Sequence, residues 1–241
     1  MKRLVSIFIA PIFVIIFFLS GPIYALTLSS VDGLWSNPDP SDANINYYFD
    51  VPINYGNGQE DQIRWGQSTG QGQSGLGFTG ISPPPFSFNV NDPFEIGLLR
   101  HFNEPIRPPS VSSVDLELHL SFSDPLINEK FTFTFQVNET PNNTGDDWLD
   151  RDFIYFPNAY PTENFELNGI SYTLKLLGFG NDPTNLVSQF ESAEHSINEA
   201  ILWGQITTAP NAVPEPSTLF SMFLALVSFL SLYYLKRLSK E

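Results

Sequence analysis

The chain of 241 residues contains no cysteine. Disulfide bridges, a thiolate nucleophile and thiolate metal ligands are therefore excluded, and the stability of the fold has to come from packing. Basic residues are also scarce: the segment 26–213 has six Lys and Arg against 24 Asp and Glu, a formal charge of −18. This charge argues against nucleic acid and anionic membrane surfaces as partners, and it suits a soluble surface protein or one that meets cations.

The C-terminus carries a membrane signal. Residues 217–235 form an uncharged run of 19 residues, which as a helix is about 29 Å long, close to the hydrocarbon thickness of a bilayer. Tyr233 and Tyr234 lie near its far end, and the basic tail 236–241 follows directly. Because basic flanks stay in the cytoplasm, the sequence predicts a transmembrane span with the preceding body outside. A buried core helix is the alternative interpretation.

The N-terminus predicts a second membrane signal, a secretory signal peptide at 1–25. Lys2 and Arg3 form its basic start, residues 4–19 are almost wholly apolar, and the pattern breaks before Ala25. Signal peptidase is expected to cut after Ala25. The alternative is a signal anchor that is not cleaved.

The stretch just before the predicted span has a sequence that a plain anchor does not need. It reads Val213, Pro214, Glu215, Pro216, Ser217, Thr218 and Leu219. With the span and the basic tail, it resembles the PEP-CTERM sorting signal of Gram-negative, exopolysaccharide-producing bacteria. The resemblance implies that 211–241 is a sorting signal, processed near the motif by an exosortase, an integral-membrane cysteine transpeptidase. The prolines disfavour helix, so Glu215 is expected in an extended segment.

The body, 26–210, has the pattern of an all-β protein. Apolar and polar residues alternate over 114–122, and again over 131–137 and 170–176. Such runs predict strands with one buried face, and clusters of Gly, Pro and Asn separate them. The body is long enough for one sizeable core. We therefore expect a single domain, a β-sandwich of jelly-roll-like type.

Several short stretches of the body resemble, in order, the choice-of-anchor K domain of bacterial surface proteins. These stretches are residues 64–66, 74–80, 94–103, 139–142 and 172–179. The resemblance covers about residues 29–207. It implies an exported body joined to an interchangeable anchor, and it implies no accepted enzymatic activity.

Two glycine-rich patterns are typical of enzymes but lack the context that those enzymes need. Residues 66–70 match Gly-x-Ser-x-Gly with Ser68 as nucleophile, a motif that requires a helix after the serine. The histidines that could complete a triad are His101, His119 and His195. Residues 70–75 match Gly-x-Gly-x-x-Gly, which requires a βαβ unit. Since the following sequence favours loop and strand, we expect no enzyme, and a secreted hydrolase is the third choice.

One acidic loop could hold a cation. Its carboxylates are Asp146, Asp147, Asp150 and Asp152. Hard oxygen ligands of this kind suit Ca²⁺, although the spacing is not that of an EF-hand. A solvated acidic loop is the simpler interpretation, so no metal or cofactor is expected.

The aromatic residues offer a second possible binding surface. A stacking platform for carbohydrate could be built from Trp35, Trp65, Trp148 and Trp203 with Tyr47 and Tyr48. Aromatics make up 15% of the chain, however, and most are needed to fill the core.

Together these patterns predict a non-enzymatic protein that is exported by a Gram-negative bacterium. Its precursor would be anchored in the inner membrane, and its mature form would lie at the cell surface or in the extracellular matrix. The expected partners are signal peptidase, an exosortase and extracellular polysaccharide. The alternative is a carbohydrate- or calcium-binding module with the same location.

Overall fold

The computed structural model describes residues 25–81, 86–124, 126–156, 161–167, 169–208, 223 and 226–228. Its strands are β1 (Ala25–Asp39), β2 (Asn46–Pro52), β3 (Gln59–Trp65), β4 (Gln67–Ser68), β5 (Ser74–Gly80), β6 (Phe86–Asn89), β7 (Pro93–Asn103), β8 (Ile106–Arg107), β9 (Ser113–Asp124), β10 (Leu126–Asn138), β11 (Asp152–Tyr155), β12 (Thr162–Leu167), β13 (Ile170–Phe179), β14 (Gln189–Ser192) and β15 (Ser196–Thr208). Residues 223 and 226–228 are helical.

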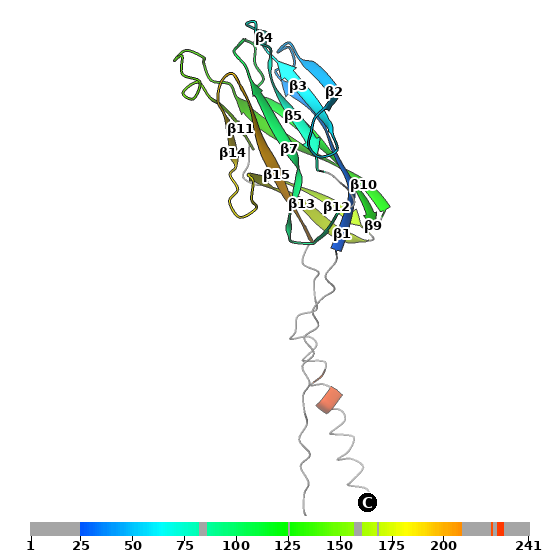
Figure 1. Ribbon diagram of the computed structural model, residues 1–241. Helices are drawn as coiled ribbons and strands as arrows, with labels where there is room; N and C mark the ends of the chain where they lie inside the picture. The colour runs from blue at the N-terminus through cyan, green and yellow to red at the C-terminus, as the bar shows by residue number, and fades with distance from the viewer. Residues whose placement is uncertain are drawn as a thin grey trace, which may run out of the picture.

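The strands form two large sheets that face each other (Figure 1). The six-stranded sheet has the order β14-β11-β10-β9-β1-β6, and the seven-stranded sheet has the order β12-β13-β15-β7-β5-β3-β2. A small third sheet pairs β4 with β8. The all-β prediction is confirmed, and the two facing sheets are consistent with a β-sandwich.

The alternating runs of the sequence become the inner faces of these sheets. In β9, Leu116, Leu118 and Leu120 are fully buried, and the residues between them are partly exposed. Strand β10 runs beside β9 with Phe131 opposite Leu118 and Phe133 opposite Leu116. Successive side chains of a strand point to opposite faces, so one apolar residue in two is enough to cover the core side of the sheet.

Aromatic rings join the two sheets across the core. Phe88 of β6 stacks on Phe94 of β7 with ring centroids 4.2 Å apart, and Phe122 of β9 stacks on Phe165 of β12 at 6.1 Å. Burial of such rings, together with the aliphatic side chains of the core, stabilises a chain that has no disulfides.

One close approach between the sheets depends on a glycine. A Cβ placed on Gly33 of β1 would lie 2.3 Å from Cδ1 of Phe78 on β5. The ring of Phe78 is almost completely buried, so it has no free space into which it could move. Gly33 therefore sets how closely β1 packs against β5.

The two ends of the folded body lie at the same end of the sandwich. Ala25, the first residue of β1, pairs with Asn89, and the backbone N–H of Asn91 donates to the carbonyl of Ile206 near the end of β15. Figure 1 shows the start of β1 at this end of the body. The loops after β7 and β10 and before β11 and β15 lie at the opposite end, which we call the distal end.

Candidate functional site

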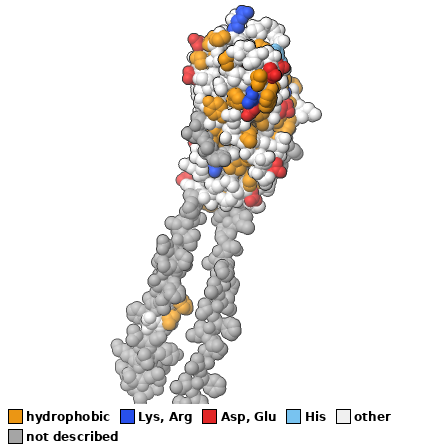
Figure 2. All heavy atoms as spheres, turned by 90° about the vertical axis from the view of Figure 1, so that its left-hand side faces the viewer, with side chains coloured by type: hydrophobic (Ala, Val, Ile, Leu, Met, Phe, Trp, Pro, Cys, Tyr) orange, Lys and Arg blue, Asp and Glu red, His pale blue; other side chains and the backbone are white. Residues whose placement is uncertain are grey.

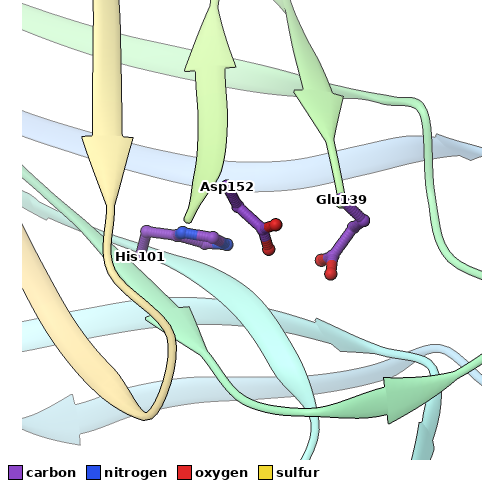
Figure 3. A group of neighbouring side chains, drawn as sticks. All are labelled: His101, Glu139 and Asp152. Atoms are coloured by element: carbon purple, nitrogen blue, oxygen red, sulfur yellow. The ribbon is translucent and has the colours of Figure 1, made fainter. Parts of the chain in front are cut away.

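Three ionisable side chains meet inside the distal end of the sandwich. His101 is near the end of β7, Glu139 follows β10, and Asp152 begins β11. Each offers a ligand atom, and these atoms lie within 4.8 Å of one another (Figure 3). We call these three residues the distal cluster. Among the described residues, it is the one group of three or more His, Asp and Glu side chains that could hold a metal ion.

Strand register explains why two of these polar side chains point inward. His101 pairs with Leu76 and follows Leu99 by two residues, so it shares the inner face of β7 with an apolar residue. Asp152 likewise precedes Ile154 by two residues on β11, and both are fully buried. The sandwich therefore carries a histidine and an aspartate where its pattern elsewhere places leucine, isoleucine or phenylalanine.

Neutral groups hold the two carboxylates in place. Nε1 of Trp65 donates to Oε1 of Glu139 at 2.6 Å, and the backbone N–H of Thr140 donates to Oδ1 of Asp152 at 2.7 Å. The indole of Trp65 also stacks on the imidazole of His101, with ring centroids 6.4 Å apart. These contacts fix the positions of the carboxylates without neutralising their charge.

Many polar atoms around this cluster have no hydrogen-bond partner in the protein. Nine such buried side-chain atoms occur among the described residues, and five lie in or beside the cluster. They are Nδ1 and Nε2 of His101, Oδ2 of Asp152, Oδ1 of Asn103 and Oε2 of Glu194. Buried polar groups are normally paired, because each unpaired one costs about 1–3 kcal/mol. Their concentration in one place indicates a role other than packing.

Burial also disfavours the charged forms of these groups. Burial, followed by the positive charge of Arg64, lowers the pKa of His101 to about 3. Burial, followed by the charge of Asp152, raises the pKa of Glu139 well above its usual 4.5, and burial raises the pKa of Asp152 as well. Burial and the charge of Asp152 raise the pKa of Glu194 to about 7. Without a nearby cation, the buried cluster therefore favours protonated carboxyl groups and a neutral imidazole.

A surface pocket reaches one side of this cluster. The pocket has a volume of about 330 Å³ and is lined by Ile106, Pro108, Ser110, Glu139, Thr140, Pro141 and Asn142. Glu139 therefore connects the buried cluster to the surface. A small ion could approach through this pocket without unfolding of the sandwich.

The four aspartates of the predicted acidic loop do not come together. Asp146 accepts hydrogen bonds from the backbone N–H groups of Trp148 and Leu149, and Asp147 pairs with His195 at 3.0 Å. Asp150 accepts from the backbone N–H groups of Thr144 and Gly145.

Asp152 alone of the four joins the buried cluster. Asp146 and Asp150 thus stabilise their own loop, Asp147 contacts His195, and Asp152 contributes to a site that the spacing of the loop did not indicate.

The glycine-rich hydrolase pattern does not form the elbow that it requires. Ser68 lies on β4, and its hydroxyl accepts hydrogen bonds from the backbone N–H groups of Gly70 and Gly72, each at 3.1 Å. Strand β5 follows after a short loop, where a hydrolase has a helix. His101 is buried in the core, and the side chain of His119 is 42% exposed on β9. The predicted loop after Ser68 is confirmed.

The proposed tryptophan platform is not formed either. Trp35, Trp65 and Trp203 are buried, and each donates its indole N–H to a protein oxygen. Trp148 is 55% exposed on the acidic loop. Tyr47 and Tyr48 are partly exposed on the edge strand β2.

Acidic side chains are scattered over the surface of the body. On the face shown in Figure 2, Asp and Glu lie apart from one another, and Lys and Arg are isolated among them. This face of the described residues therefore has no basic patch of the kind that binds nucleic acid.

The predicted sorting elements lie outside the described residues. These elements are the signal peptide up to Tyr24, the motif 213–219, most of the span 217–235 and the basic tail 236–241. In the part of the chain that is described, no helix has the length and apolar character needed to cross a membrane. Ala25 is described, and it is the exposed first residue of β1, directly before the buried Leu26.

The sequence did not predict the distal cluster as a unit. The sequence offers His101 as a possible triad member and Asp152 as a possible calcium ligand, and it places Glu139 only in a stretch that resembles a family. One signal was present: the alternation of β7 puts His101 on the same face as Leu99. No protein-family model matches the chain, and no curated protein is significantly similar to it.

Proposed function

We propose that this chain is a non-enzymatic, exported surface or extracellular-matrix protein. A signal peptide delivers it, and an exosortase-type transpeptidase sorts it through its C-terminal PEP-CTERM tail. The observation that carries this proposal is the three-part tail itself: the Pro-Glu-Pro motif at 214–216, the apolar run that ends at Leu235, and the basic residues behind it.

The shape of the body supports the proposal. Its first and last strands, β1 and β15, begin and end on one side, so a β-sandwich of jelly-roll type attached there presents its distal end to the outside. Leu26, the first residue that a cut after Ala25 would leave, is buried in the core, so such a cut keeps the apolar residues of β1 in the body.

The test is to replace Pro214, Glu215 and Pro216 together by Ala and leave the span intact. The parent chain should lose the residues after the motif and leave the inner membrane, and the altered chain should accumulate there with its tail. Membrane fractionation and mass spectrometry of the C-terminal peptide measure both outcomes. Asn211→Ala, just outside the motif, is the control and should be processed like the parent. If parent and triple variant both keep the tail, the C-terminus is an ordinary anchor.

A second role, carbohydrate binding, is favoured by the outer face of the seven-stranded sheet. There Tyr48, Gln62, Arg64, Gly72 and Gln73 line a hollow of about 290 Å³. Tyr48 is 48% exposed, and the guanidinium of Arg64 lies 3.3 Å above the ring of Phe102. Aromatic faces beside planar polar groups are suited to sugar rings, which have apolar faces and hydroxyl edges.

A glycan array, run with and without Ca²⁺, tests this second role. Tyr48→Ala should remove the signal. Tyr47→Ala, one residue along the same strand and on its other face, should leave the signal unchanged. If no glycan binds, the carbohydrate-binding role is rejected, and the role as a sorted surface protein is unaffected.

A further inference from the structure

We propose that His101, Glu139 and Asp152 bind one divalent first-row transition-metal ion inside the distal end of the sandwich. The ligands would be one imidazole nitrogen and at least two carboxylate oxygens. This inference does not depend on how the chain is sorted.

The two carboxylates need a positive partner. Glu139 and Asp152 lie side by side and contact each other through their carboxyl groups, and the other hydrogen bonds that reach them come from neutral donors, the indole of Trp65 and Thr140. Neither carboxylate forms an ion pair with a lysine or arginine among the described residues. A buried carboxylate is stable only when it is protonated, paired with a cation or bound to a metal.

The histidine selects a metal rather than a shared proton. His101 is fully buried, and neither of its ring nitrogens has a hydrogen-bond partner in the protein. Figure 3 shows its imidazole edge directed toward the carboxylate of Asp152, with Glu139 on the other side of that carboxylate. A proton shared between the carboxylates would leave both ring nitrogens unpaired, whereas a metal ion bound to all three side chains gives one of them a partner.

The same histidine decides the class of metal. Ca²⁺ and Mg²⁺ take oxygen ligands, while imidazole combined with carboxylate suits Zn²⁺ and its first-row neighbours. The absence of cysteine from the chain restricts a site of this kind to nitrogen and oxygen donors.

Neighbouring side chains can complete the coordination or orient the ligands. Glu194 has one free carboxylate oxygen and interacts electrostatically with both Glu139 and Asp152. Its other oxygen accepts a hydrogen bond from Nδ2 of Asn142 at 3.1 Å, so the side chain is fixed beside the site. Such outer partners hold metal ligands in place and typically change affinity about 10–100-fold when they are removed.

The spacing of the ligand atoms requires only a small contraction. They lie within 4.8 Å of one another. Two ligands at about 2.1 Å from one ion are at most about 4.2 Å apart, so the ligand atoms would have to approach by roughly 0.6 Å at most. Glu139 also faces the 330 Å³ pocket, which gives the ion a route from solvent.

The test uses the full chain, purified in detergent through a tag without histidine, stripped with a chelator and dialysed. Zn²⁺ should bind with a stoichiometry of one per chain, measured by elemental analysis after gel filtration. A hundredfold excess over Kd should raise Tm by about 5–10 °C, since an ion that binds only the native state stabilises it. Trp fluorescence should also change, because Trp65 contacts both His101 and Glu139.

Isosteric variants locate the ion. His101→Gln and Asp152→Asn should each weaken Zn²⁺ binding at least about tenfold. The controls are His119→Gln, at a partly exposed histidine on β9, and Asp147→Asn in the acidic loop, and both should bind like the parent. If the first two variants do not fold, X-ray absorption spectroscopy of the Zn²⁺-loaded parent identifies the ligands instead. The spectrum should then show scattering from an imidazole ligand.

Three results would overturn the proposal. The first is no saturable Zn²⁺ uptake by the parent. The second is uptake that His101→Gln leaves unchanged, or an absorption spectrum without imidazole. The third is a preference for Ca²⁺ that is lost in Asp147→Asn, which would put the cation in the acidic loop.

Discussion

The indole Nε1 of Trp65 donates a hydrogen bond of 2.6 Å to Oε1 of Glu139, 74 residues further along the chain. Trp65 ends β3 in the seven-stranded sheet, and Glu139 follows β10 in the six-stranded sheet. The contact therefore ties the two sheets together at the distal end. It also supplies the one side-chain donor that reaches Glu139 among the hydrogen bonds of the described residues.

Trp65→Phe should lower the free energy of unfolding by about 1–3 kcal/mol. The phenyl ring keeps much of the buried apolar surface, but the carboxyl of Glu139 loses its donor. Urea unfolding followed by circular dichroism measures the change. Trp148→Phe, at a ring that is 55% exposed, is the control and should change stability by less than about 0.5 kcal/mol. Equal effects of the two substitutions would show that the indole N–H is not the stabilising group.

Glu60→Gln should also destabilise the fold, by about 1–3 kcal/mol. Glu60 is fully buried on β3, and its carboxylate accepts from Nε and Nη2 of Arg100 at 2.5 and 2.7 Å. The amide cannot neutralise Arg100, which is itself largely covered. Glu199→Gln is the control, since Glu199 is half exposed and 3.8 Å from Arg100, and it should have little effect. A neutral result for Glu60→Gln would contradict a stabilising ion pair.

Gly33→Ala should destabilise the sandwich by about 1–3 kcal/mol through overpacking. The new Cβ would lie 2.3 Å from Cδ1 of Phe78, whose ring is held in the core. Thermal unfolding of the single variant and of Gly33→Ala with Phe78→Leu separates the causes. Phe78→Leu alone creates space at the same position, so the double variant should lose less stability than the sum of the two single ones. Strict additivity would mean that the clash is not the cause.

The exported protein should begin at Leu26. Because Ala25 is exposed at the start of β1, Ala25→Leu should block cleavage without disturbing the fold, and the chain should then keep residues 1–25. Mass spectrometry of the N-terminal peptide reads out both forms. Ala10→Leu, inside the apolar run, is the matched substitution and should be cleaved normally. An intact Met1 on the exported parent would mean that the segment is an anchor.

The sequence by itself determined the class of fold. Residues 114–122, 131–137 and 170–176 alternate with a period of two, and they form parts of β9, β10 and β13. Alternation is a local property that determines which side chains share a face of a strand. The strands can therefore be predicted without knowing which strands pair with them. The predicted loop at the glycine-rich segment after Ser68 follows from equally local chemistry.

Only the tertiary structure decided which of these faces meet. The distal cluster draws its members from β7, from the end of β10 and from β11, which belong to two different sheets. Strand order and register bring them together, and both depend on long-range pairing that no local pattern encodes. For the same reason, four aspartates that are close in sequence separate into loop contacts and one buried ligand candidate. Three of the four tryptophans of the imagined platform likewise turn into the core, because burying their rings stabilises the fold more than exposing them.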